Sequence, residues 1–209
     1  MSDYILYFDG SCTPNPGGIA TYSYVLEKDE GKIGADIIIK FDNFLGEGED
    51  MTCNLAEYKG LIEGLRFIGD NFEKMKPSKI IVRGDSQLVV NQSGGKWKVN
   101  ADNLKDSSCV VANIITILND WKCQVVFEWV PREQNKLADK LTQKALKDYR
   151  NKIKSESKPA TLGVFDVVLG CDDCPKKCRE YLKPGDKIFM FCSAQGEYGR
   201  GDWRVCVEK

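Results

Sequence analysis

Four acidic side chains, spread over an alternating pattern of strands and helices, are the residues most able to do chemistry. They are Asp9 in FDGSCTPNPGG, Glu57 in NLAEYKGLIEGL, Asp85 in VRGDSQLVVNQ and Asp139 in NKLADKL. Three of them end or follow apolar strand-like runs or lie near the start of a helix, so we expect them at one edge of a sheet. Carboxylates gathered there repel each other unless cations lie between them. The set predicts a site for hard divalent metals that activate water against phosphate.

The composition narrows the class of protein. The chain has 209 residues, of which 42% are hydrophobic, enough for one ordinary domain and a small one. No apolar run approaches the length of a bilayer span and no leader precedes Tyr4, so we expect a soluble cytoplasmic protein without a membrane partner. The formal net charge is −1. A polyanionic partner would therefore need a local basic patch.

Histidine is missing from the whole chain. Its absence excludes Ser-His-Asp catalysis, Cys-His catalysis and Cys2His2 metal sites. The remaining chemical groups are carboxylates, thiolates and lysines.

The spacing of apolar residues predicts an α/β domain. Strands are expected at residues 3–9, 19–27, 33–41, 79–84 and 123–130. Helices are expected at residues 54–73, in the segment DSQLVVNQSGG, at about 101–119 and at 134–149. In the first helix, Asn54 is expected as the N-cap, with Glu57 three residues later in the N3 position. The order βββαβααβα predicts a five-stranded mixed sheet flanked by helices.

A change in composition divides the chain. We expect a catalytic domain over residues 1–149, a polar and basic linker over 150–160, and a Cys-rich, β-containing module over 161–209. Within that module, residues 187–192 and 202–208 are predicted to pair as strands around a Gly-rich turn.

Five of the nine cysteines lie in the C-terminal module. They are Cys171, Cys174, Cys178, Cys192 and Cys206. Because a CxxC turn points two thiolates at one ion, we expect a Zn²⁺ site formed by the first four, with Cys206 as a possible substitute. A Cys192–Cys206 disulfide, free thiols and an iron–sulfur cluster are the alternatives. The other cysteines are expected to be buried small hydrophobic residues, namely Cys12, Cys53, Cys109 and Cys123.

Several motifs, taken in order, make residues 3–148 resemble type 1 ribonuclease H. They are FDGS followed by a Pro/Gly loop, N-x-x-E-Y on a helix, GDSQLVVNQ after a strand, and WVPRE-x-N-K-x-A-D at the last strand–helix junction. The short segment between Gly94 and Asn103 resembles the archaeal-like and bacterial members that lack a long basic handle. The C-terminal module resembles no family that we can name.

The resemblance implies an activity and a set of ligands. Two Mg²⁺ or Mn²⁺ ions would be bound by Asp9, Glu57, Asp85 and Asp139, with Asp9 bridging them. The enzyme would cut the RNA strand of an RNA/DNA hybrid and leave 5′-phosphate ends. An endonuclease of this kind needs no histidine, because metal ions neutralise the charge of the phosphoryl transition state.

The resemblance also implies contacts with the substrate. Asn54 and Gln87 match side chains that read the minor groove, and Thr52 matches a residue that holds a DNA-strand phosphate. The loop that meets RNA 2′-hydroxyl groups corresponds to residues 10–18, including Gly10, Ser11, Cys12 and Asn15. Asn135 matches an asparagine near the active site. Trp97, between Lys96 and Lys98, is expected either to contact nucleic acid or to be a packed side chain between solvated lysines.

This chain departs from the family in two places. Many members carry a histidine in the loop before the last helix, and here either Arg132 or Glu133 replaces it in part, or nothing does. Cys53 stands where the family often has an amide.

Other interpretations remain open at this point. Asp85 could be only a helix cap before Ser86, and Asn54 only an N-cap. The same site could act on double-stranded RNA, or the protein could be a non-catalytic hybrid-binding module or a structural protein on this fold. The C-terminal module could grip the hybrid in place of the missing handle. We expect a monomer.

Overall fold

The computed structural model describes residues 2–29, 36–156, 187–192 and 203–208. Its contacts divide the chain into two compact units, Met1–Arg150 and Asn151–Lys209. The division of the protein into a catalytic domain and a Cys-rich module stays a prediction, and each unit is described by itself. Among the described residues, no helix is both long and apolar enough to cross a membrane.

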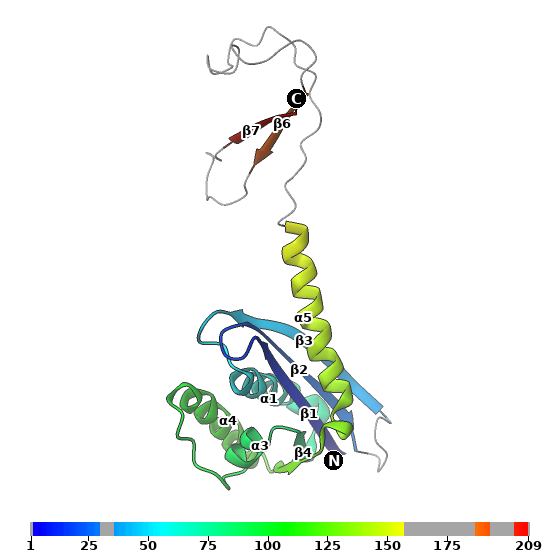
Figure 1. Ribbon diagram of the computed structural model, residues 1–209. Coiled ribbons are helices and arrows are strands. Elements are labelled where there is room, and N and C mark those ends of the chain that lie inside the picture. The colour runs from blue at the N-terminus through cyan, green and yellow to red at the C-terminus, as the bar shows by residue number, and fades with distance from the viewer. Residues whose placement is uncertain (1, 30–35, 157–186, 193–202, 209) are drawn as a thin grey trace. The chain divides into compact units, whose positions relative to one another are not determined.

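The first unit is built on a mixed sheet, as predicted (Figure 1). Its strands are β1 (Ser2–Thr13), β2 (Ile19–Lys28), β3 (Asp36–Glu47), β4 (Pro77–Gly84) and β5 (Gln124–Trp129). They lie in the order β3-β2-β1-β4-β5. The pairs β1–β2 and β2–β3 are antiparallel, whereas β1–β4 and β4–β5 are parallel. The parallel centre brings the carboxyl ends of β1, β4 and β5 to one edge of the sheet.

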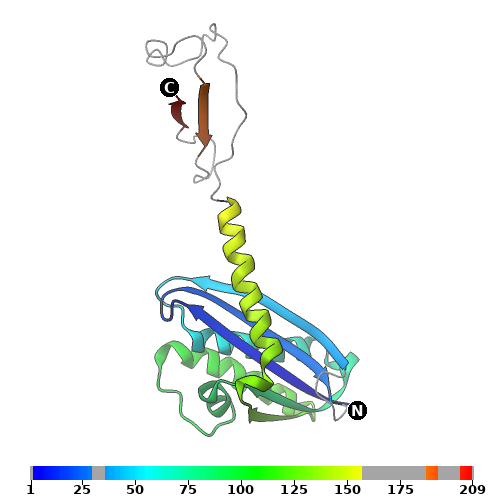
Figure 2. The ribbon, with the colours of Figure 1, turned by 45° about the vertical axis from the view of Figure 1, so that its right-hand side comes forward.

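Helices cover both faces of the sheet (Figure 2). They are α1 (Cys53–Asp70), α2 (Phe72–Met75), α3 (Gln87–Ser93), α4 (Asp102–Asp120), the 3-10 turn η1 (Arg132–Gln134) and α5 (Lys136–Glu156). The α1 and α4 helices lie on one face, and α5 crosses the other. The predicted order of strands and major helices is therefore confirmed, with the short α2 and η1 as additions.

The central strand β1 is buried on both faces, which explains the apolar run YILYF at residues 4–8. Leu6 and Phe8 join the core under α1 and α4. Ile5 and Tyr7 belong to a second cluster that includes Ala138 of α5. Alternate residues of one strand therefore hold helices on opposite faces.

The start of α1 differs from the prediction. Its N-cap is Thr52, whose hydroxyl accepts a hydrogen bond of 3.2 Å from the backbone N–H of Leu55. Thr52 has the extended backbone that a cap requires, whereas Asn54 lies inside the first turn. The expected N-cap role of Asn54 and the N3 position of Glu57 are therefore wrong.

The helix α5 is longer than predicted and includes part of the expected linker. It runs to Glu156, so residues 150–156 are helical. The segment RNKIKSE is polar, but Arg, Lys and Glu favour a helix that faces solvent as readily as they favour a linker. Residues 157–160 lie outside the part of the chain that the structure describes.

The cysteines of the first unit only partly match the prediction of buried residues. Cys12 and Cys123 are buried, Cys53 is half-buried and Cys109 is exposed. Cys109 lies on the solvent side of α4, whereas Val111, two residues later, is buried on the other side of the helix. For Cys109 the prediction is therefore wrong.

The second unit contains the predicted strand pair. Strands β6 (Lys187–Cys192) and β7 (Trp203–Glu208) are antiparallel, with Cys192 opposite Trp203 and Phe189 opposite Cys206. The two cysteines are thus three positions apart along the ladder, about 10 Å at the usual rise, which is longer than the Cα separation of a disulfide. This register does not support the Cys192–Cys206 disulfide. Cys171, Cys174 and Cys178 lie outside the described residues, so the zinc site stays a prediction.

Candidate active site

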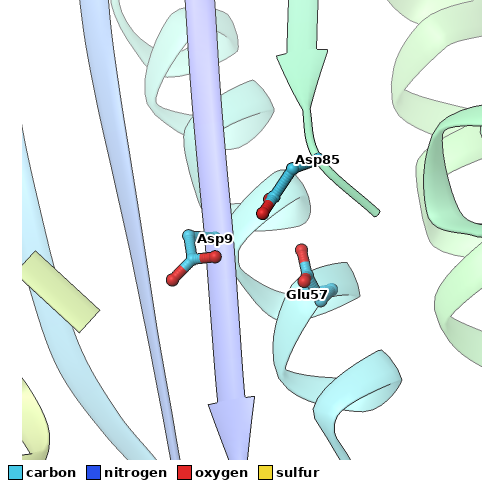
Figure 3. A group of neighbouring side chains, drawn as sticks. All are labelled: Asp9, Glu57 and Asp85. Atoms are coloured by element: carbon cyan, nitrogen blue, oxygen red, sulfur yellow. The ribbon is translucent and has the colours of Figure 1, made fainter. Parts of the chain in front are cut away.

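Three of the four predicted acids meet beside the central strand. Each of Asp9, Glu57 and Asp85 offers one carboxylate oxygen, and these oxygens lie within 4.8 Å of one another (Figure 3). Asp9 comes from β1, Glu57 from the second turn of α1, and Asp85 from the residue after β4. We call this set the acid cluster.

Two glycines allow α1 to approach the sheet closely enough to deliver Glu57. A Cβ on Gly10 would lie 2.1 Å from the backbone nitrogen of Glu57. A Cβ on Gly60, one turn further along α1, would lie 2.7 Å from the carbonyl oxygen of Ser23. Since no real side chain tolerates such distances, the helix backbone lies directly on β1 and β2 at this point. This close contact places Glu57 beside Asp9.

Asp85 is not the cap of a helix, and its backbone is held by a hydrogen bond from another strand. The N-cap of α3 is Ser86, whose side chain accepts from the backbone N–H of Val89 at 3.4 Å. The carbonyl of Asp85 accepts a hydrogen bond of 3.0 Å from the indole nitrogen of Trp129. The interpretation of Asp85 as only a cap is therefore excluded, and its carboxylate points into the acid cluster (Figure 3).

Asn135 connects the acid cluster to β1 from the entrance of α5. Its side chain is buried, and Nδ2 donates to the carbonyl of Phe8 at 2.9 Å and to Oδ1 of Asp85 at 2.9 Å. Its Oδ1 is buried without a hydrogen-bond partner among the described residues. Asn135 is therefore a positioning residue for Asp85, with one acceptor left unused.

Asp139, the fourth predicted acid, lies beside the acid cluster and not within it. Its Oδ1 accepts from the guanidinium of Arg132, and its Oδ2 accepts from Nε2 of Gln143 at 2.7 Å. Its charge nevertheless contributes to the raised pKa of Asp9, so the two carboxylates share one electrostatic site.

The electrostatics of the acid cluster favour a bound cation. Burial raises the pKa of Asp9 to about 7, and the charges of Asp85 and Asp139 act in the same direction. Burial also raises the pKa of Glu57 well above its usual range, and Asp9 and Asp85 add to that rise. A cation among the carboxylates would reverse these shifts, because it favours the charged form.

The donor set fits a hard divalent ion. All three groups of the acid cluster offer carboxylate oxygens, the ligands that Mg²⁺ and Ca²⁺ prefer. Oε2 of Glu57 is buried without a hydrogen-bond partner in the described part of the chain. An orphaned carboxylate oxygen is costly in a protein interior, and coordination to a metal ion removes that cost.

The loop between β1 and β2 is fastened to the start of α1. The thiol of Cys12 is buried and donates to the carbonyls of Pro14 at 3.1 Å and Met51 at 3.3 Å. Oδ1 of Asn15 accepts from the backbone N–H of Cys53 at 3.0 Å. Near the loop, Ser11 and Thr21 share a hydrogen bond of 3.0 Å between their hydroxyls. The predicted substrate loop is therefore held in one place before any ligand binds.

The remaining predicted contact residues lie at the surface or close to it. Gln87 is exposed at the first position of α3, and Asn54 is half-buried in the first turn of α1. Trp97 is 48% exposed, between the exposed Lys96 and Lys98. About half of the Trp97 side chain is thus open to solvent, and its contact with nucleic acid stays a prediction.

Sequence reasoning missed three residues that shape the site. Gln143 lies one turn after Asp139 and holds its carboxylate, a spacing that the sequence displays. The hydroxyl of Thr142 lowers the pKa of Asp9. Trp129 supports the backbone of Asp85, a contact between β5 and the end of β4 that no local pattern signals.

Comparison with known proteins agrees with this geometry. A family model described as reverse transcriptase-like matches residues 8–145. Ribonuclease HI of Halobacterium salinarum is 34% identical over 143 residues, which cover 68% of this chain and 63% of that protein. This chain belongs to the type 1 ribonuclease H family. It spans less than two-thirds of the Halobacterium relative.

Solved structures of ribonuclease H domains share the fold. The N-terminal ribonuclease H domain of Rv2228c from Mycobacterium tuberculosis gives a TM-score of 0.61 at 27% identity, covering 73% of this chain and 99% of that one. LC11-RNase H1 in complex with an RNA/DNA hybrid gives a TM-score of 0.62 at 30% identity, covering 70% of this chain and 99% of that one.

Proposed function

We propose that this protein is a metal-dependent endoribonuclease that hydrolyses the RNA strand of RNA/DNA hybrids. The observation that carries the proposal is the acid cluster, in which three carboxylates meet within 4.8 Å and one buried oxygen has no hydrogen-bond partner among the residues that the structure describes. Membership of the ribonuclease H family and the hybrid-bound relative LC11-RNase H1 support the choice of substrate. A binding module would gain nothing from three mutually repelling acids.

The acid cluster would hold Mg²⁺ or Mn²⁺, and two ions would be held by Asp9, Glu57, Asp85 and Asp139 together. Bound divalent ions supply an activated water and stabilise the leaving 3′-oxygen, so that the product carries a 5′-phosphate. Asn135 holds Asp85 in place for this role. Arg132 keeps a positive charge beside the acids and lowers the pKa of Asp9 and Glu57.

Thr52, in the cap of α1, and Asn15, in the loop between β1 and β2, each keep hydrogen-bond donors that suit a duplex containing RNA. The hydroxyl of Thr52 accepts from Leu55, so its own hydrogen remains to be donated to a phosphate of the DNA strand. The amide of Asn15 uses its oxygen on Cys53, so its two N–H groups remain for RNA 2′-hydroxyls.

Other side chains are proposed to read the groove and to stack. Asn54 and Gln87 can each donate and accept, which suits groove edges without demanding one sequence. Gly10, Ser11 and Cys12 would support the loop that meets the RNA strand. Trp97 offers an exposed ring to the nucleic acid. A monomeric state and a cytoplasmic location are part of the same proposal.

The test compares a labelled RNA/DNA hybrid, the same RNA paired with RNA, and the single-stranded RNA. Each is incubated with the protein in Mg²⁺, in Mn²⁺ and in chelator, beside an Asp85→Asn variant. We expect metal-dependent cutting of the hybrid's RNA strand that the variant loses. Preferred cutting of double-stranded RNA would change the substrate, and hybrid binding without any cutting would make the protein a binding module.

A further inference from the structure

A row of positive side chains follows the outer face of α5. We call it the α5 basic stripe, and it consists of Lys136, Lys140, Lys147 and Arg150. All four side chains are exposed. At 3.6 residues per turn they fall within an arc of about 80° and extend along about 21 Å of the helix. The sequence spacing and the exposure together place four cations on one side of the helix, with the uncharged Gln143 between Lys140 and Lys147.

The opposite face of α5 is the one that packs on the sheet. Ala138, Thr142 and Ala145 are buried there, and the carbonyl of Ala138 accepts from Ser23 of β2 at 2.8 Å. These contacts fix the rotation of the helix, so the stripe has no freedom to turn inward.

The acids near the stripe pair with other cations. Lys144, between the members of the stripe but on another side of the helix, pairs with Asp42 at 2.9 Å and Asp148 at 3.3 Å. Within the described ranges, no ion pair engages any member of the α5 basic stripe. On α5, Asp139 pairs with Arg132 and Asp148 pairs with Lys144, so these acids leave the four cations of the stripe for a ligand.

The stripe is continuous with the candidate active site. Lys136 follows Asn135 directly, and Asp139 lies at the edge of the stripe one turn into the helix. From there α5 crosses the sheet toward β3, where Lys144 meets Asp42 (Figure 2). A duplex held at the acid cluster could thus extend along the stripe.

We propose that the α5 basic stripe binds backbone phosphates of the RNA/DNA hybrid beyond the bond that is cut. This inference rests on the proposed function. The net charge of the chain is −1 and the acid cluster repels phosphate, so affinity for a polyanion must come from a local group of cations. A length of about 21 Å corresponds to about six nucleotide steps along one strand.

The experiment measures the affinity of the full chain for a labelled hybrid of about 24 base pairs as salt is varied, in chelator to prevent cutting. The variant Lys140→Gln/Lys147→Gln removes two members of the stripe. The control Lys74→Gln/Lys76→Asn removes two exposed lysines from the turn before β4, at the opposite end of that strand from Asp85. Both variants change the net charge from −1 to −3, since −1 − 2 = −3.

We expect the stripe variant to bind the hybrid about tenfold or more weakly at 0.1 M salt, and the slope of log K against log salt to fall by about 2. The control should retain the affinity and slope of the unaltered protein. Equal losses in both variants, or no loss in either, would overturn the proposal. Cutting of the hybrid by the unaltered protein in Mg²⁺ reports the proposed function separately. A protein that fails to cut but shows the stripe effect would disprove only that function.

Discussion

The side chain of Asn135 donates a hydrogen bond of 2.9 Å to Oδ1 of Asp85. The same nitrogen donates to the carbonyl of Phe8, the residue before Asp9. One buried amide therefore links the carboxylate that follows β4 to the backbone that carries the carboxylate of β1. The arrangement makes the acid cluster depend on a residue that need not touch the substrate.

Two substitutions of Asn135 should distinguish its hydrogen bonds to Asp85 and Phe8 from its contribution to packing. Asn135→Ala removes both hydrogen bonds and should lower the free energy of unfolding by about 1–3 kcal/mol, with reduced hybrid cutting. Asn135→Asp keeps the shape but places a carboxylate against Asp85, so its defects should be larger at pH 8 than at pH 5. Thermal unfolding and cutting rates measure both effects. An Asn135→Asp protein as active as the unaltered one at pH 8 would refute the positioning role.

Arg132 should control how readily the acid cluster takes up metal. Its charge lowers the pKa of both Asp9 and Glu57, so Arg132→Gln should raise both. The acids would then hold protons to higher pH, and the acid limb of the pH–rate profile should move upward, with a higher half-saturating Mg²⁺ concentration. Arg132→Lys keeps the charge and should retain most of the profile.

A fall in the Mg²⁺ requirement of Arg132→Gln, instead of a rise, would have a different meaning. The guanidinium pairs with Asp139, so it occupies the carboxylate that a metal ion would need, and the two positive charges would repel each other. A lower Mg²⁺ requirement in Arg132→Gln would show that Arg132 competes with the ion, and that its effect on Asp9 is minor.

The raised pKa of Asp9 predicts a pH-dependent stability in the absence of metal. A carboxyl that titrates near 3.8 when unfolded and at about 7 when folded stays protonated longer in the folded state. The contribution of this carboxyl to the free energy of unfolding is fully present below about pH 4 and is lost as the pH rises through 7. In chelator, the free energy of unfolding should therefore fall over this range by at most about 4 kcal/mol.

Bound Mg²⁺ and the substitution Asp9→Asn should each reduce this loss of stability with rising pH. Saturating Mg²⁺ should raise the unfolding temperature more at pH 8 than at pH 5, because the ion favours the charged carboxylates. In Asp9→Asn the fall in stability between pH 4 and 7 should shrink. Melting curves with the same slope against pH in both proteins would assign the effect to another group.

The parts of the site that sequence could predict are those set by local pattern. Asp9 and Asp85 follow apolar runs that had to become neighbouring strands, and Glu57 lies on a helix with a clear apolar face. The structure brings these three carboxylates together, as the prediction of a shared metal site requires. The cap of α1 was misassigned because Thr52 and Asn54 are both capping residues, and the backbone geometry decides between them.

Two features of α5, the partner of Asp139 and the end of the helix, could not be predicted in this way. Asp139 turns to Arg132 because η1 and the first turn of α5 face each other, which depends on the whole strand–helix junction. The end of α5 was missed because an exposed polar helix shows little apolar periodicity. Polarity alone therefore suggested a linker where the chain continues as a helix.

The contact between Gly10 and α1 predicts a severe effect from a single methyl group. In Gly10→Ala the new Cβ would lie 2.1 Å from the backbone nitrogen of Glu57, so α1 must move away from β1. We expect a loss of about 1–3 kcal/mol or more in the free energy of unfolding. Because Glu57 moves with the helix, hybrid cutting and stabilisation by Mg²⁺ should fall together.

Gly69→Ala is the matched control, since it adds the same methyl group to the last turn of the same helix. A Cβ at Gly69 meets nothing within 4 Å, and its backbone is not left-handed. The change should therefore leave cutting intact and stabilise the helix by up to about 1 kcal/mol. If Gly10→Ala instead unfolds and cuts like Gly69→Ala, the close approach of α1 to β1 is not what places Glu57 beside Asp9.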